Sequence, residues 1–186
     1  MKRWRHSILC LGLVVMLLPL AVLADGTLSG NPGGVAPVEG LAIDRLATRS
    51  GPATEYRDTG TYRVEGEYVR LISRAYDRNG LCWVQCEVLY GNKLRRVYTG
   101  LKRFDTATFD LSSVPEEVPL DYQAKVTATS KAMYGPGDGY GTYAELTVDQ
   151  GQTVTMIAVE NDYAQVEWTT SIQSYRAWVP VHTLRY

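Results

Sequence analysis

Two copies of one short stretch decide how this chain folds: Gly51-Pro52-Ala53-Thr54-Glu55-Tyr56 and Gly135-Pro136-Gly137-Asp138-Gly139-Tyr140. A Gly-Pro pair favours a turn, because proline fixes φ and glycine adopts backbone angles that other residues avoid. Each copy follows a segment of alternating apolar and polar residues and precedes the same order of strand-like runs. We therefore expect each copy to open a separate module of short β-strands.

The two halves of the chain also match beyond these stretches. An offset of 80 residues pairs identical or similar side chains: Trp83 with Tyr163, Gln85 with Gln165, Glu87 with Glu167, and Tyr98 with Trp178. Short runs bounded by turn signals, repeated once along the chain, are typical of tandem small barrels. The sequence thus predicts an all-β protein with two β-barrels of five to six short strands each.

Composition agrees with this fold class. The 186 residues are 45% hydrophobic and include 13 tyrosines but only 2 phenylalanines. Tyrosine, threonine and valine suit the pleated, half-buried surface of a sheet. The 17 glycines, scattered along the chain, suit many tight turns.

The first residues are typical of a secretory signal. A basic segment at residues 2–5 precedes an apolar run from Ile8 to Val22, and Ala24 ends a cleavage site of small or modest residues. The run is short for a membrane-spanning helix, which needs roughly 20 apolar residues. An uncleaved anchor is the alternative, and contact with a membrane is expected only through this segment. We expect a protein that is secreted or held at the cell surface, on the extracellular side.

The chain divides into five predicted segments. The leader is rich in glycine and proline and has no apolar period, and Pro115 and Pro119 flank acidic residues in the linker. The segments are a signal peptide at 1–24, a flexible leader at 25–40, a first barrel at 41–105, a linker at 106–120 and a second barrel at 121–186.

Charge argues against a nucleic-acid partner. Cleavage after Ala24 would leave 16 basic and 20 acidic residues, a net charge of −4, whereas nucleic-acid binding needs a basic footprint. The charge is uneven: residues 38–105 carry 12 basic and 9 acidic side chains, and residues 106–186 carry 4 and 10. These are either ordinary solvated faces or a sign that the first half meets an anionic polymer or the acidic half of another copy.

The run from Cys82 to Val88 reads as a strand with two different faces, because successive side chains point in opposite directions. Its cysteines and valines are expected to face the core, and Trp83, Gln85 and Glu87 to face outward. Cysteines four residues apart in a strand lie about 13 Å apart, and a disulfide needs Cα atoms within about 7 Å. We therefore expect no disulfide and two buried thiols.

Motifs for catalysis do not stand out. There is no Gly-x-Ser-x-Gly, no phosphate-binding glycine loop and no His-Glu-x-x-His pattern. A nucleophilic pair of Cys82 or Cys86 with His182 is disfavoured, because both cysteines are expected on the core face. Glu116 and Glu117 are read as solvated charge rather than as an acid-base pair. We expect no enzyme, no cofactor and no metal site.

The chain from about Leu41 onward resembles the bacterial Src-homology-3 (SH3) domain family, of the type found in secreted proteins of Gram-positive bacteria. The first half carries the resemblance in Ala47–Tyr56, in Asn79–Gln85 and in the closing run Tyr98–Arg103. The second half carries it in Gly135–Tyr140 and Arg176–Pro180. The resemblance implies two tandem SH3-like barrels, each partly open.

The resemblance also implies a function. Members of the family commonly bind peptidoglycan or other cell-wall peptides in a groove between the long first loop and the loop before the third strand. Matching positions make Tyr56 and Trp83 the ligand-binding candidates of the first repeat, and Tyr140 and Tyr163 those of the second. We expect a non-enzymatic pair of extracellular binding modules for a cell-wall peptide or another extracellular protein.

Other interpretations stay open. Trp83 and Tyr163 would each merely cover their own loop if neither contacts a ligand. The chain would be a structural or assembly protein if its barrels pack on each other or on a partner subunit, and a regulator of a secreted enzyme is a further alternative. The second half departs from the first, with tyrosine in place of Trp83, so the two modules need not share a ligand.

Overall fold

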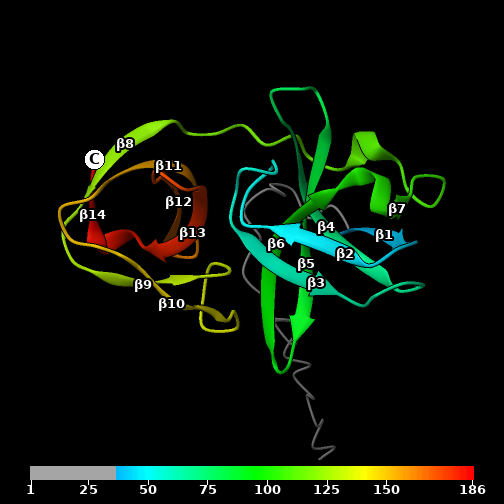
Figure 1. Cartoon of the computed structure of the whole chain (residues 1–186), viewed down its shortest axis with the longest axis horizontal. Coiled ribbons are helices and arrows are strands. Elements are labelled where there is room, and N and C mark those ends of the chain that lie inside the picture. The colour runs from blue at the N-terminus through cyan, green and yellow to red at the C-terminus, as the bar shows by residue number, and fades with distance from the viewer. Residues whose placement is uncertain (1–36) are drawn as a thin grey trace, which may run out of the picture.

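The computed structural model describes residues 37–186, so the predicted signal peptide at 1–24 and most of the predicted leader lie outside the described residues. The described chain is all-β. It forms two antiparallel sheets of seven strands each, and Figure 1 shows both sheets strongly curved, joined by a linker. Among residues 37–186 no helix is long and apolar enough to cross a membrane.

The first sheet has the strand order β3-β2-β6-β5-β4-β1-β7. Strand β1 pairs with both β4 and β7, so the last strand of this half returns beside the first. The strands are β1 (Val38–Ala42), β2 (Leu46–Arg49), β3 (Asp58–Tyr62), β4 (Tyr68–Tyr76), β5 (Cys82–Tyr90), β6 (Lys93–Gly100) and β7 (Phe104–Asp105).

The second sheet has the order β10-β9-β13-β12-β11-β8-β14, which is the order of the first sheet with each number raised by seven. The internal repeat of the sequence is therefore also a repeat of topology. We call β1–β7 the first repeat and β8–β14 the second repeat. The strands of the second are β8 (Tyr122–Val126), β9 (Ser130–Met133), β10 (Thr142–Val148), β11 (Thr153–Glu160), β12 (Tyr163–Thr169), β13 (Ser174–Pro180) and β14 (Leu184–Arg185).

Each half has more strands than the five to six expected. The apolar stretch before the first Gly-Pro turn is two strands, β1 and β2, and not one. The segment around Tyr62, which reads as a polar loop, is strand β3, whose Tyr62 is buried. The flexible-leader prediction is wrong for residues 38–40, because their backbone pairs with β4 in the sheet.

The core prediction for β5 is correct on one face and wrong on the other. Val84, Cys86 and Val88 are buried among the apolar side chains of the core, as expected. Trp83 and Gln85, expected to point outward, are only 9% and 4% exposed. The outward face is covered because the second repeat and neighbouring loops pack against it, which alternation along one strand cannot reveal.

The linker is built into the fold. It contains a 3-10 helix at Leu111–Ser113, and Val114 after it is fully buried. Its next part, residues 115–120, is called the strap here. The Arg74 N–H of β4 donates to the carbonyl of Pro115 at 2.8 Å, and the Leu120 N–H donates to the carbonyl of Ile157 in β11 at 3.0 Å. The strap therefore joins β4 of the first repeat to β11 of the second.

Candidate functional site

The first loop of each repeat reaches the fifth strand of the other repeat, β12 or β5. The Tyr56 hydroxyl donates a hydrogen bond to Glu167 of β12 at 2.7 Å. The Tyr140 hydroxyl donates in the same way to Glu87 of β5. These tyrosines and glutamates occupy equivalent positions in the two repeats, so the contact is reciprocal.

Backbone hydrogen bonds repeat this exchange. In one direction, the Arg57 N–H donates to the Ser174 carbonyl at 2.9 Å, and the Ser174 N–H donates to Glu55 at 3.1 Å. In the other, the Leu94 N–H donates to Gly139 at 3.1 Å, and the Gly141 N–H donates to Leu94 at 3.0 Å. Such an arrangement, with each half offering the same patch, is that of an isologous two-fold interface, here formed within one chain.

The structure explains why glycine precedes proline in both copies of the stretch. A Cβ added at Gly51 would overlap the ring of Tyr56, and a Cβ added at Gly135 would overlap the ring of Tyr140. Each tyrosine ring therefore lies flat on the glycine that opens its own loop. The repeated stretch works as a unit that turns the chain and directs a hydroxyl to the other repeat.

Each of these glutamates also binds an arginine of its own repeat. The Arg96 Nε donates to Glu87 at 2.8 Å, and the Arg176 Nε donates to Glu167 at 2.5 Å. The two terminal nitrogens of Arg96 donate to Glu160 of the second repeat at 2.6 and 3.1 Å, and both of these side chains are 1% exposed. Burial alone lowers the pKa of Arg96, but the bonds to Glu160 and the nearby negative groups outweigh it and raise that pKa.

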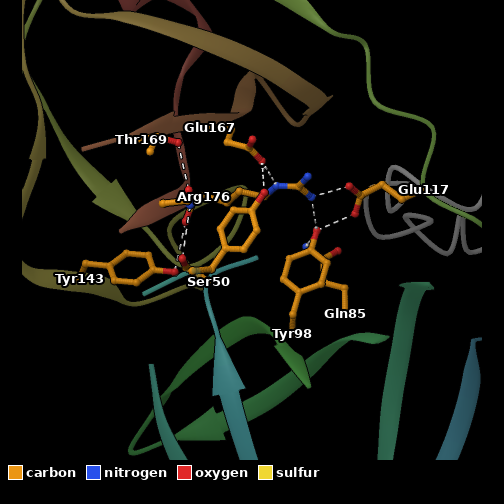
Figure 2. A network of polar contacts seen from close by, with 10 residues as sticks. Ser50, Gln85, Tyr98, Glu117, Tyr143, Glu167, Thr169 and Arg176 are labelled. Atoms are coloured by element: carbon orange, nitrogen blue, oxygen red, sulfur yellow. Dashed lines mark hydrogen bonds and ion pairs between the residues drawn. The ribbon is translucent and has the colours of Figure 1, made fainter. Parts of the chain in front are cut away.

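Arg176 is the second charged centre of this interface (Figure 2). Figure 2 shows its guanidinium between Glu167 on one side and Glu117 with Tyr98 on the other. Its Nη1 donates to the Tyr98 hydroxyl at 3.2 Å, and that hydroxyl donates to Glu117 of the strap at 2.6 Å. Burial, followed by the charge of Glu117, raises the pKa of Tyr98, so this phenol stays protonated as a donor.

Cation–aromatic contacts between the repeats use several of the tyrosines and arginines. The Arg57 guanidinium of the first repeat lies 6.0 Å from the ring centroids of Tyr143 and Tyr175 in the second. The Arg95 guanidinium lies 4.4 Å from the ring of Tyr134. Arginine over an aromatic face is attracted to the ring's negative quadrupole. Part of the basic excess of the first repeat therefore faces the second repeat of the same chain.

The structure does not bring Tyr56 and Trp83 together as two walls of one groove. Tyr56 lies at the interface, and the pocket beside Trp83 is lined by Thr54 from the same loop. Tyr140 also lies at the interface. Tyr163 is half-buried beside Asp138 of its own first loop; burial is the main cause of its raised pKa and the Asp138 charge adds to it.

A pocket of about 560 Å³ opens beside Trp83 in the first repeat. Leu81 and Leu101 give it apolar walls, and three basic side chains also line it: Arg49, Lys102 and Arg103. The sequence predicts an exposed ring at Trp83, and the structure shows a buried one. The side chain still forms part of the pocket wall. A pocket with an aromatic and apolar lining and a few convergent polar groups is the ordinary form of a ligand site.

The loop before β5 holds this wall in place. Asp77 Oδ1 accepts from the N–H groups of Asn79 at 2.8 Å and Leu81 at 3.0 Å, while Oδ2 accepts from the Trp83 indole at 3.3 Å. The Leu81 N–H is the main reason that the pKa of Asp77 is lowered. The Leu81 side chain is left 61% exposed at the mouth of the pocket.

The basic side chains differ in how much of their charge is neutralised. Arg49 pairs with Asp58, and Arg103 pairs with Asp44. Lys102 is exposed and has no acidic partner among the residues that the structure describes. A carboxylate entering the pocket would therefore find one ammonium group unpaired.

The two cysteines of the described chain are free thiols, Cys86 in the core and Cys82 half-buried at the Trp83 pocket. The prediction that Cys82 is buried in the core is thus wrong: this residue is the first of β5 and is only partly buried. In residues 37–186 no group of three or more His, Cys, Asp or Glu side chains is placed to hold a metal ion.

Iodoacetamide is expected to modify Cys82 slowly and Cys86 only after unfolding, because the thiolate is the reactive form. Burial raises the pKa of Cys86 to about 12. Burial also raises the pKa of Cys82, against the opposing charge of Arg74. Peptide mapping by mass spectrometry, with and without denaturant at mildly alkaline pH, measures both. Complete modification of Cys86 without denaturant would contradict its place in the core.

Comparison with known proteins adds no relative: no family model matches the chain, and no curated protein matches it. The interface residues that sequence reasoning missed are the charged centres Arg96, Glu160, Glu117 and Arg176. A signal for two of them was present, since Arg96 and Arg176 are identical residues at the offset of 80 that relates the repeats. Nothing in the sequence pairs Glu160 with Arg96.

Proposed function

We propose that this chain is a non-enzymatic extracellular binding protein, built from two SH3-like barrels, that binds an anionic cell-wall peptide in the Trp83 pocket. The pocket carries the proposal, because it combines an aromatic and apolar lining with basic side chains. It lies at the position that the resemblance assigns to the groove, between the first loop and the loop before β5. The residues that contact the ligand are Trp83, Leu81, Lys102 and Thr54.

The electrostatics of the pocket favour a carboxylate. The unpaired ammonium of Lys102 offers a compact charge that a peptide carboxylate can reach from solvent. Arg49 and Arg103, although paired, hold further positive charge at the same wall. The ligand's apolar groups would then pack on Leu81 and Trp83, which supplies affinity by removing apolar surface from water.

The second repeat is not equipped for the same ligand. At the positions equivalent to Arg49, Lys102 and Arg103 it has Met133, His182 and Thr183. Tyr163, its counterpart of Trp83, lies near the acidic Asp138. An anionic peptide would meet fewer positive charges there, so the proposal assigns binding to the first repeat.

Co-sedimentation with purified cell walls tests the proposal. Lys102→Glu is expected to weaken binding at least tenfold, about 1.4 kcal/mol, because it replaces the unpaired cation by an anion on an exposed side chain. Trp83→Ala is expected to weaken binding as well, and circular dichroism checks that it stays folded. Tyr163→Ala is the matched control and should bind like the parent protein.

Two outcomes would contradict the proposal. The first is a parent protein that does not sediment with walls above the level of an unrelated control protein. The second is a Lys102→Glu variant that binds as tightly as the parent. Equal loss of binding in Tyr163→Ala would move the site to the second repeat.

A structural role is the second candidate, and one observation favours it. The hydroxyls of Tyr56 and Tyr140 are both used in contacts between the two repeats. In this alternative the repeats serve to hold each other in a fixed arrangement, and the protein acts as a rigid spacer or assembly subunit. A folded protein with no affinity for walls would favour it.

A further inference from the structure

A second cavity, of about 340 Å³, lies where the two repeats and the strap meet. Its wall from the first repeat includes Ile72 and Gln85, and its wall from the second includes Gln165 and Trp178. The strap covers one side, held by its backbone bonds to β4 and β11. This cavity shares no lining residue with the Trp83 pocket.

The two repeats differ in how they satisfy the polar groups of this cavity. In the first repeat, the Gln85 amide donates to the Tyr98 hydroxyl at 3.2 Å. In the second repeat, Trp178 replaces that tyrosine, and an indole N–H is a donor that accepts no hydrogen bond. Gln165, the counterpart of Gln85, therefore has no equivalent acceptor.

One buried polar atom is left without a partner at the cavity. The Trp178 side chain is buried and its Nε1 has no hydrogen-bond partner. Gln165 is 4% exposed and lines the same cavity. Buried polar groups are nearly always paired, because an unpaired one has lost its hydrogen bonds to water without replacement. An unpaired indole N–H next to the amide of Gln165 indicates that a polar ligand belongs there.

The charges around the cavity are already paired. The three nitrogens of Arg96 donate to Glu87 and Glu160. Glu117 of the strap binds Arg176, and Glu116 binds Arg74. What remains for a ligand is neutral: the Trp178 indole N–H, the Gln165 amide, the side-chain oxygen of Gln85 and the apolar side chains of the wall. The chemistry therefore fits an uncharged ligand and not an ion.

We propose that this cavity binds a neutral peptide segment. A main-chain carbonyl accepts from the Trp178 indole or the Gln165 amide, and a main-chain N–H donates to a glutamine side-chain oxygen. A small apolar side chain packs on Ile72 and Ile157, which line the cavity from the two repeats. Because both repeats contribute, this site exists only while they are packed together.

Titration of the ¹⁵N-labelled protein with N-acetyl-L-valine methylamide, a neutral peptide-bond mimic, tests the proposal by NMR. The Trp178 indole resonance and the Gln165 side-chain amide resonances are expected to shift in a saturable manner. Gln165→Met keeps the length of the side chain but removes its amide, and it should weaken binding at least tenfold. Gln150→Met, at an exposed position outside the cavity lining, should bind like the parent.

The same spectra also show whether each variant is folded. The rest of the spectrum shows whether Gln165→Met is folded, and Trp178→Phe, which keeps a ring but lacks the N–H, is the second variant. The absence of shifts at Trp178 and Gln165 up to the solubility limit of the mimic would overturn the proposal. So would saturable shifts with N-acetylglucosamine but not with the peptide mimic, since the site would then take a sugar.

Discussion

Arg96→Met is expected to destabilise the folded protein by about 3–5 kcal/mol, because it leaves a buried carboxylate without its partner. Arg96 and Glu160 are each 1% exposed, and Arg96 also binds Glu87. Methionine fills much of the same volume, so the loss reports the charge and its hydrogen bonds and not a cavity. Urea unfolding, followed by circular dichroism, measures the change in the free energy of unfolding.

An exposed ion pair supplies the control. Arg45 and Glu65 are 56% and 42% exposed, so Arg45→Met is expected to cost less than about 1 kcal/mol. The double variant Arg96→Met with Glu160→Leu is expected to recover most of the stability, since both charges are then gone. A loss below 1 kcal/mol for Arg96→Met alone would show that this pair does not join the repeats.

Gly51→Ala and Gly135→Ala are expected to destabilise the protein by about 1–3 kcal/mol each, the ordinary cost of overpacking. In each variant the new methyl group would overlap the tyrosine ring that lies on that glycine. The ring must then move and withdraw its hydroxyl from Glu167 or Glu87. The loss should therefore appear as weaker packing between the repeats and a lower free energy of unfolding.

The second loop offers a matched control for this prediction. Gly139 lies four residues after Gly135, and a Cβ there would meet no atom within 4 Å. Gly139→Ala is expected to be near neutral in the same urea titration, which excludes a general intolerance of side chains in the loop. If Gly135→Ala were equally neutral, the ring of Tyr140 would not be fixed on that glycine.

The parts of the fold that depend on local pattern could be predicted from the sequence. Alternation placed Val84 and Cys86 in the core, as the structure confirms. An Asn-Gly pair favours a turn with positive φ, and Gly80, which follows Asn79, has a φ of +75°. The offset of 80 residues predicted a repeat, which the identical strand orders confirm. Strand β3 was missed because most of its side chains are polar, and its place is set by pairing with β2.

The parts that depend on distant partners could not be predicted. Gln85 and Trp83 look outward-facing on a single strand, because nothing in the strand shows what covers it. Tyr56 and Tyr140 were groove candidates through the resemblance alone, whereas the structure directs their hydroxyls to the opposite repeat. In an internal repeat, both surfaces of the interface are present in one sequence, but no residue pattern shows that they contact each other.

The most direct test of the binding site is an NMR titration of the ¹⁵N-labelled protein with a purified anionic cell-wall peptide. The account predicts that the Trp83 indole and the Lys102 backbone amide shift together and saturate, with weaker binding at high salt because charges at the rim are screened. Saturable binding that leaves the Trp83 indole and the Lys102 amide unmoved would contradict the account.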